Sequence, residues 1–312
     1  MSDLAGLTLL GDVLVRATPL ILTGLAVAIA FQAGVLNIGA EGQLLIGATC
    51  AIAITLLLGP IMGRGVIAVA LIGGALAGSA WAAIAAELRQ RFHVLEVIST
   101  IMLNFVAVYV VSFLVRGPLQ EPAHIYPQTQ TLPAYSHLPI VLPGTRVHGG
   151  VLIAVFACMA AWWILQRTAT GFRIRAVGKN PHAARIAGRI DVDRVTRNVF
   201  LASGALAGLA GAIEVLGVTF ALYENLSPGY GYTAIAVALL AGLNPLWVIV
   251  SGLFFGALEV GANTLQRDAG IPTTLVLVIE ALIILGVLAL ERLRNFDILR
   301  NRVIADSTFD RA

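Results

Sequence analysis

The chain has 312 residues, of which 58% are hydrophobic and only 12% are charged, about half the charged share of ordinary soluble domains. Its mean hydropathy is +0.90, and its few ionisable side chains cannot cover a water-exposed surface of this size. Lipid solvates apolar side chains directly, so the composition excludes a soluble globular domain and predicts an all-α integral membrane protein.

Nine segments are apolar enough to be interpreted as membrane helices, because about 20 apolar residues cross about 30 Å of hydrocarbon. In chain order they are residues 8–31, 38–58, 65–87, 94–115, 149–166, 198–222, 231–244, 246–264 and 272–290. Two of them, 149–166 and 231–244, are short, and we expect them to be tilted, broken or incompletely spanning. We predict one transmembrane domain over residues 1–312, a bundle of about nine helices.

The basic residues predict the orientation in the membrane. Residues 87–93, the loop 167–197 and the tail 291–312 hold 15 of the 20 Lys and Arg residues, and they fall on one side of the nine spans. Cytoplasmic loops are enriched in Lys and Arg, so the N-terminus is predicted outside and the C-terminus in the cytoplasm. The formal net charge of +3 therefore reflects topology, and no nucleic-acid partner is expected. The first residues lack a basic n-region followed by a small-residue cleavage site, so we expect no removable signal peptide.

The first unusual stretch, Gly34–Gly47, reads GVLNIGAEGQLLIG and places Asn37, Glu41 and Gln43 among four glycines. A carboxylate near hydrocarbon must face protein or water, and glycines permit a broken helix. One interpretation is a kink that faces or gates a path. The other is a helix N-terminus at the interface, with Asn37 as its cap. The residues leave both open.

The long outer loop, 116–148, holds six of the twelve prolines and is predicted to be extended. Its histidines, His124, His137 and His148, are widely spaced, without an accompanying Cys or carboxylate pattern. This favours a solvated cap over the mouth of the bundle against a metal site, and we expect no metal and no cofactor.

A second break follows in Glu224–Gly242, ENLSPGYGYTAIAVALLAG, with Tyr230 and Tyr232 beside it. Two interrupted segments in comparable places of the two halves indicate a transport path. Asn104, at mid-span, either bonds to a neighbouring helix or lines that path. Small-residue faces at 73–78 and 204–211 predict tight packing between helices or between subunits. The candidate path residues are Asn37, Glu41, Gln43, Asn104, Glu214, Tyr230 and Tyr232.

The loop 167–197 is amphipathic and basic. Asn180 is a good helix cap, Pro181 suits the first helical position, and Gly188 is predicted to end a helix of one or two turns. From the residues alone, an ordinary basic loop that meets anionic lipid head groups remains the alternative.

Residues 178–188, GKNPHAARIAG, resemble the coupling loop of bacterial ABC importer permeases. Three further blocks, residues 16–48, 96–122 and 229–263, are similar in order to the simple-sugar and nucleoside branch of the branched-chain amino acid/ribose-type permease family. Residues 96–122 resemble its nucleoside-type members. Fuller members usually carry one more N-terminal helix, so the resemblance leaves open whether this chain is a short variant.

The resemblance implies a permease subunit in the bacterial cell membrane that forms the path for a nucleoside or simple sugar. It implies three kinds of partner: ATPase subunits, a second permease subunit, identical or homologous, and an extracytoplasmic substrate-binding protein. The residues that it assigns to coupling with the ATPase are Gly178, Lys179, Asn180, Pro181, Ala183, Ala184, Arg185 and Gly188. The chain has no GxxxxGK[ST] loop, so ATP hydrolysis is expected on a separate subunit.

Two other classes of protein compete with this interpretation. A secondary transporter or channel would use the carboxylates Glu41, Glu214 and Glu280 as ion or proton sites. A membrane enzyme would need a nucleophile and base or a metal motif such as HExxH or GxSxG, and neither occurs. The residues do not distinguish a nucleoside from a sugar.

Overall fold

The computed structural model describes residues 2–187 and 190–269, with 275, 278–279, 281–282 and 285–286. Two compact units divide the chain, Met1–Val260 and Gly261–Ala312, and the arrangement described below is that of the first. Most of the predicted segment 272–290, including Glu280, lies outside the described residues, as does Gly188.

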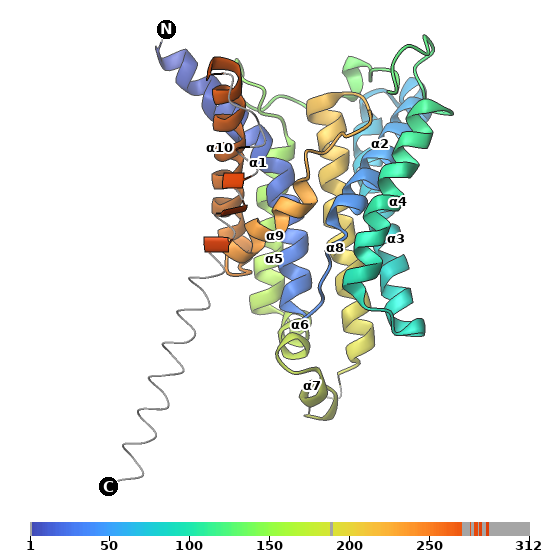
Figure 1. The fold of residues 1–312 in the computed structure, drawn as a ribbon, viewed down its shortest axis with the longest axis vertical. Helices are drawn as coiled ribbons and strands as arrows, with labels where there is room; N and C mark the ends of the chain where they lie inside the picture. The colour runs from blue at the N-terminus through green and yellow to red at the C-terminus, as the bar shows by residue number, and fades with distance from the viewer. Residues whose placement is uncertain are drawn as a thin grey trace. The chain divides into compact units, whose positions relative to one another are not determined.

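Helices make up most of the described chain (Figure 1). They are α1 (Ser2–Gln32), α2 (Ala40–Met62), α3 (Val66–Phe92), α4 (Glu96–Arg116), α5 (Gly150–Arg167), α6 (Ala169–Lys179), α7 (Pro181–Ala187), α8 (Val192–Glu214), α9 (Tyr230–Leu240) and α10 (Pro245–Ala269). Short helices η1 (Gly63–Gly65) and η2 (Ala134–Ser136) and a π-helix, η3 (Val215–Thr219), lie between them.

Six helical stretches of the described residues are long and apolar enough to cross a membrane. One of them, Ala40–Phe92, contains both α2 and α3, which turn at η1 and pack against each other. The prediction of an all-α membrane bundle is confirmed. Predicted segment 231–244 is short as expected, since α9 has 11 residues, whereas predicted segment 149–166 forms an uninterrupted helix of 18 residues.

Glycines bring α2, α3 and α8 into backbone contact. A Cβ added to Gly78 would lie 2.3 Å from the carbonyl oxygen of Gly204, and one added to Gly47 would lie 2.3 Å from that of Gly208. The predicted small-residue faces 73–78 and 204–211 therefore pack on each other within one chain. Such close approach increases dispersion contact between helices, which apolar surroundings do not otherwise drive together.

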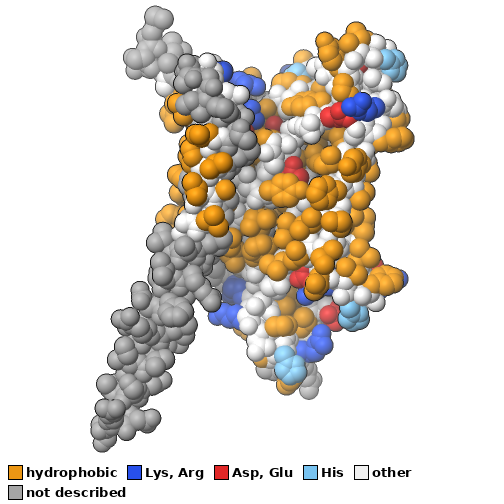
Figure 2. Space-filling view, viewed as in Figure 1, with side chains coloured by type: hydrophobic (Ala, Val, Ile, Leu, Met, Phe, Trp, Pro, Cys, Tyr) orange, Lys and Arg blue, Asp and Glu red, His pale blue; other side chains and the backbone are white. Residues whose placement is uncertain are grey.

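The two ends of the first unit differ from its middle. Figure 2 shows hydrophobic side chains over the middle of the visible face, with most charged and histidine side chains towards its ends. Helix α7 lies at the lower end of Figure 1, and the loop between α4 and α5 lies at the upper end. A membrane protein needs this distribution, with apolar side chains facing the lipid tails and charged side chains facing water at both ends.

The loop between α4 and α5 is packed more closely than predicted. Its backbone N–H groups at Thr129, Leu132 and Leu138 donate to carbonyl oxygens of residues 216–222 at 2.8 to 2.9 Å, and Thr129 is fully buried. Buried backbone groups of an irregular segment need such partners. The expectation of a solvated cap is therefore wrong for this part of the loop, which packs on the segment after α8.

Candidate functional site

The first predicted break lies between α1 and α2, where the chain rises from the lower end of the bundle to its middle (Figure 1). Asn37 is fully buried there. Its Nδ2 donates to Ser203 Oγ at 2.8 Å and to Gln43 Oε1 at 3.0 Å, and its Oδ1 accepts from Gly39 N at 2.9 Å. The residue that caps α2 is Gly39, so the predicted cap at Asn37 is wrong by two positions.

Asn104 of α4 supports the same break from the other side. Its Oδ1 accepts from Gly42 N at 2.9 Å, and its Nδ2 donates to Ile38 O at 3.0 Å. Its Nδ2 also approaches the hydroxyl of Tyr232 at 3.4 Å. Backbone groups freed by a broken helix inside an apolar bundle must be satisfied within the protein, and this amide satisfies two of them. These contacts fit the interpretation in which Asn104 bonds to neighbouring segments of the bundle.

The second predicted break ends at α9. Ser227 Oγ accepts from the backbone N–H groups of Gly229 and Tyr230, both at 3.1 Å, and Glu41 Oε2 accepts from Gly231 N at 2.7 Å. A Cβ on Gly231 would lie 2.2 Å from the backbone nitrogen of Glu41. Glu41 therefore places its carboxyl group at the N-terminus of α9, which favours negative charge. The two breaks, 190 residues apart, touch.

A charged cluster joins α1, α8, α9 and α10. Arg16 Nη1 lies 3.3 Å from Glu259 Oε1 and donates to Tyr230 OH at 2.9 Å. Glu214, almost fully buried, interacts electrostatically with Arg16. The side chains of Arg16 and Glu259 stay 38% and 20% exposed, although both lie in candidate spans. Charges at such depth face water or protein, so this face is unsuited to contact with lipid tails.

At the upper end, Glu224 forms an ion pair with Arg116, whose Nη2 lies 2.8 Å from Glu224 Oε2. The hydroxyl of Ser112 also donates to this carboxylate. Hydrogen bonds from Arg116 and Ser112 lower the pKa of Glu224 to about 2. The pair ties the end of α4 to the segment that leads into the second break.

The three loop histidines are separate. His137 stacks on Phe220 at 3.8 Å between ring centroids, His124 lies 3.0 Å from Gln120, and His148 is buried before α5. Burial, with a smaller contribution from Arg146, lowers the pKa of His148 to about 4. Among the described residues, no group of three or more His, Cys, Asp or Glu side chains is placed to hold a metal ion.

The predicted coupling helix is α7. Asn180 Oδ1 accepts from Ala183 N at 2.9 Å and Pro181 is the first helical residue, so the predicted helix start is confirmed. Val177, Ala184, Ile190 and Val192 form a small buried core that fixes α7 to α6 and α8. The outer face of α7 is exposed, with Ile186 69% exposed.

The start of α8 is braced against the end of α3. Arg185 lies 3.4 Å from Asp193, and Gln90 of α3 donates to the carbonyl oxygen of Asp193 at 2.7 Å. A polar hollow of about 420 Å³ separates this contact from the turn between α3 and α4, and His93 and Glu96 line it. These contacts therefore hold α7 and the start of α8 against the end of α3, beside a polar hollow.

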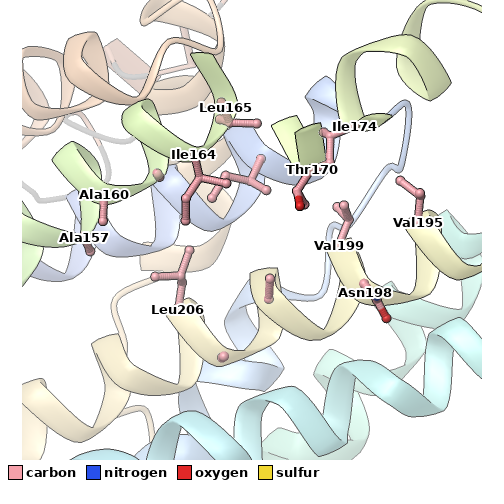
Figure 3. A pocket seen from close by; sticks show the side chains of 14 residues that line it. Ala157, Ala160, Ile164, Leu165, Thr170, Ile174, Val195, Asn198, Val199 and Leu206 are labelled. Atoms are coloured by element: carbon pink, nitrogen blue, oxygen red, sulfur yellow. The ribbon is translucent and has the colours of Figure 1, made fainter. Parts of the chain in front are cut away.

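An apolar groove of about 550 Å³ runs between α5, α6 and α8 (Figure 3). Ile164, Leu165, Val199 and Leu206 line it with small residues, and its polar side chains are Thr170 and Asn198. Such a lining offers a hydroxylated solute few partners, so we do not place the path there.

The predicted polar residues fall into two groups. Asn37, Glu41, Gln43, Asn104 and Tyr232 surround the two breaks, whereas Tyr230 and Glu214 belong to the charged cluster. Sequence reasoning missed Ser203, which donates to Ala26 O at 2.8 Å, and Gln32, at the end of α1. Each is a single polar residue in or beside an apolar run, and this position in the sequence was the feature that could have identified it.

These features define a membrane transport protein of the permease type. The helices are long and apolar enough to span a membrane, two helix breaks meet inside the bundle, and α7 is held against its neighbours at one end. The family described as "Branched-chain amino acid transport system / permease component" matches residues 9–288. The chain belongs to this family and is a multi-pass membrane protein.

Curated relatives agree with this assignment. The glucose ABC transporter permease protein TsgB13 of Haloferax volcanii is 38% identical over 299 residues, covering 92% of this chain and 78% of the relative. The guanosine ABC transporter permease protein NupP of Bacillus subtilis is 38% identical over 282 residues, 89% and 80% of the two chains. The nucleoside ABC transporter permease protein NupB of Lactococcus lactis is 31% identical over 293 residues, 91% and 80%. The predicted role as an ABC transporter permease is confirmed.

Proposed function

We propose that the chain forms one half of the translocation path of an ABC importer for a nucleoside or a simple sugar. The names of the relatives support this solute class, since they include permeases for guanosine, nucleosides and glucose. The contact between the two helix breaks carries the proposal, because discontinuous helices that meet inside a bundle mark solute paths in transporters. The solute enters beside the breaks, near Tyr232, which is 45% exposed.

The partners follow from the same proposal. ATP is hydrolysed on separate ATPase subunits, a second permease subunit completes the path, and a binding protein delivers the solute on the outer side. Arg16 and Glu259 support a second subunit or a water-filled path, because their partly exposed charges cannot face lipid tails. The N-terminus is outside and the C-terminus is cytoplasmic, with the lower end of Figure 1 inside.

Residues 178–188 dock on the ATPase. The exposed face of α7 supports this role, since Ile186 is 69% exposed and the side chain of Arg185 is 61% exposed. Arg185 also keeps α7 in register with α8 through Asp193. Closure of the ATPase would then move α7 as a rigid element.

A matched pair of variants tests the docking role. Ile186→Asp places a charge on the exposed face of α7, and Ile140→Asp places one on the loop between α4 and α5, where Ile140 is 63% exposed. We expect the first to abolish copurification of the ATPase and ATP-driven uptake, and the second to preserve both. Full uptake after deletion of residues 178–188 would contradict the proposal.

A further inference from the structure

Helix α9 is held at both of its ends by the first break. At its N-terminus, Glu41 accepts from Gly231 N at 2.7 Å. At its C-terminal turn, Gln32 Nε2 donates to Leu243 O at 2.6 Å. Glu41 lies in the first turn of α2, and Gln32 is the last residue of α1. Residues on both sides of the first break therefore hold the two ends of α9.

The turn that Gln32 holds is a tight one. Gly242 and Leu243 both have positive φ, 57° and 59°, and Leu243 N donates back to Ala238 O at 2.9 Å. Asn244 follows and its side chain accepts from Leu246 N, near the start of α10. Leu243 O is therefore fixed in space by the backbone, and a displacement of Gln32 acts directly on the end of α9.

Gln32 is also in contact with the loop that carries α7. A Cβ added to Gly178 of α6 would lie 1.9 Å from the carbonyl oxygen of Gln32 and 3.1 Å from the carbonyl carbon of Ala33. Helix α6 thus packs backbone to backbone on the end of α1, directly above α7 (Figure 1). The core of Val177 and Ala184 joins α6 to α7, so a displacement of α7 would carry α6 with it.

The side chain of Gln32 has unused bonding capacity. Its Oε1 is buried and has no hydrogen-bond partner among the described residues. A buried acceptor without a partner is rare and needs a reason, and one such reason is a second arrangement in which it is satisfied. The side-chain amide of Gln32 therefore contacts the turn after α9 through Nε2 alone. This single hydrogen bond to Leu243 O can change when α1 shifts.

We propose that Gln32 is a positioning residue that transmits displacement of α7, through Gly178 and the end of α1, to α9. The inference rests on the proposed function, because it assumes that an ATPase moves α7. Helix α9 is then the element that opens and closes the path beside the breaks, and its position depends on the bond from Gln32 Nε2 to Leu243 O.

The test uses the complete importer reconstituted in proteoliposomes with its ATPase, second permease subunit and binding protein. Gln32→Glu keeps size and acceptor oxygens but cannot donate to Leu243 O, and Gln32→Met removes both functions with similar length. Gln166→Glu, at an exposed position near the end of α5, is the matched control. We expect solute imported per ATP hydrolysed to fall about tenfold in both Gln32 variants, with ATP hydrolysis and assembly retained.

A distance measurement separates transmission from a merely structural role. Spin labels on Leu240→Cys of α9 and, as a reference outside the proposed route, Tyr109→Cys of α4, which are 39% and 73% exposed, are introduced after Cys50 and Cys158 are replaced by Ala. Trapping ATP should shift this distance in the wild type and leave α9 unmoved in Gln32→Glu.

An unchanged ratio of uptake to hydrolysis, or an ATP-dependent shift of α9 equal to that of the wild type, would overturn the proposal. If both Gln32 variants lost assembly, ATP hydrolysis and uptake together, Gln32 would have a structural role. That result would overturn the proposal as well. The proposed function fails separately, if the wild-type complex shows no ATP-driven uptake at all.

Discussion

Polar side chains in the middle of this permease bond both to one another and to backbone groups that the broken helices expose. Asn37 and Asn104 each bond to two or more groups around the first break, and both are almost fully buried. Leaving such a group without a partner costs about 1–3 kcal/mol, which is more than the net gain from a typical hydrogen bond. At the residue scale, these amides stabilise the shape of the break.

Replacing Asn37 by Leu tests this role. The change leaves the N–H of Gly39 and the side chain of Gln43 without their partner, so we expect about 1–3 kcal/mol of destabilisation. Thermal unfolding in detergent measures it as a midpoint lower by several degrees. Asn198→Leu, at an exposed position on α8, is the control and should change little. An unchanged midpoint for Asn37→Leu would refute the structural role.

His148 predicts a pH dependence. Its pKa is lowered from 6.5 to about 4 in the folded protein, chiefly by burial. Below pH 6.5 the unfolded chain binds a proton that the folded chain does not, so stability falls between about pH 6.5 and 4 and then levels off. The loss from this group is at most about 3 kcal/mol. His148→Asn keeps an acceptor for Gly150 N and should lose less stability over that range.

The measurement is the thermal midpoint at a series of pH values from 7 to 4. His124→Asn, at an exposed loop position, should follow the wild type throughout. If His148→Asn follows the wild type too, the buried neutral imidazole is not the source of the acid sensitivity.

At the scale of helices, glycine contacts determine which elements pack together. Gly78→Ala would place a Cβ 2.3 Å from Gly204 O, where backbone cannot yield without separating α3 from α8. We expect about 1–3 kcal/mol of destabilisation, the usual cost of overpacking, seen as a lower unfolding midpoint. Gly261→Ala in α10 has open space around the added methyl group and should be neutral or stabilising, because Ala favours helix. Equal effects of the two changes would contradict the contact.

Hydropathy and glycine patterns were enough to predict where the helices lie and where two of them break. The sequence also predicted the start of α7, because Asn180 and Pro181 are local signals. It did not predict that Glu41 would reach α9, since a pattern within one segment carries no information on a partner 190 residues away. Gln32 was missed for the same reason, since its partners, Gly178 and Leu243, lie far along the chain.

At the scale of the whole molecule, the distribution of Lys and Arg favours the orientation proposed above. Cysteine labelling from outside the cell tests it, in a chain whose Cys50 and Cys158 are replaced by Ala. Ile125→Cys, 70% exposed in the loop between α4 and α5, should react with an impermeant maleimide on intact cells. His182→Cys, exposed on α7, should react only after permeabilisation. The reverse pattern would invert the topology and remove α7 from the side of the ATPase.

The central claim is that solute crosses this permease at the expense of ATP hydrolysed by a partner. Uptake of radiolabelled guanosine and glucose into proteoliposomes that contain the reconstituted complex is the most direct measurement. We expect uptake of one of these solute classes to require MgATP on the side of α7 and a binding protein on the other side, and to be indifferent to a protonophore. Uptake by the permease chain alone, driven by an ion gradient and independent of ATP, would contradict the claim and favour a secondary transporter.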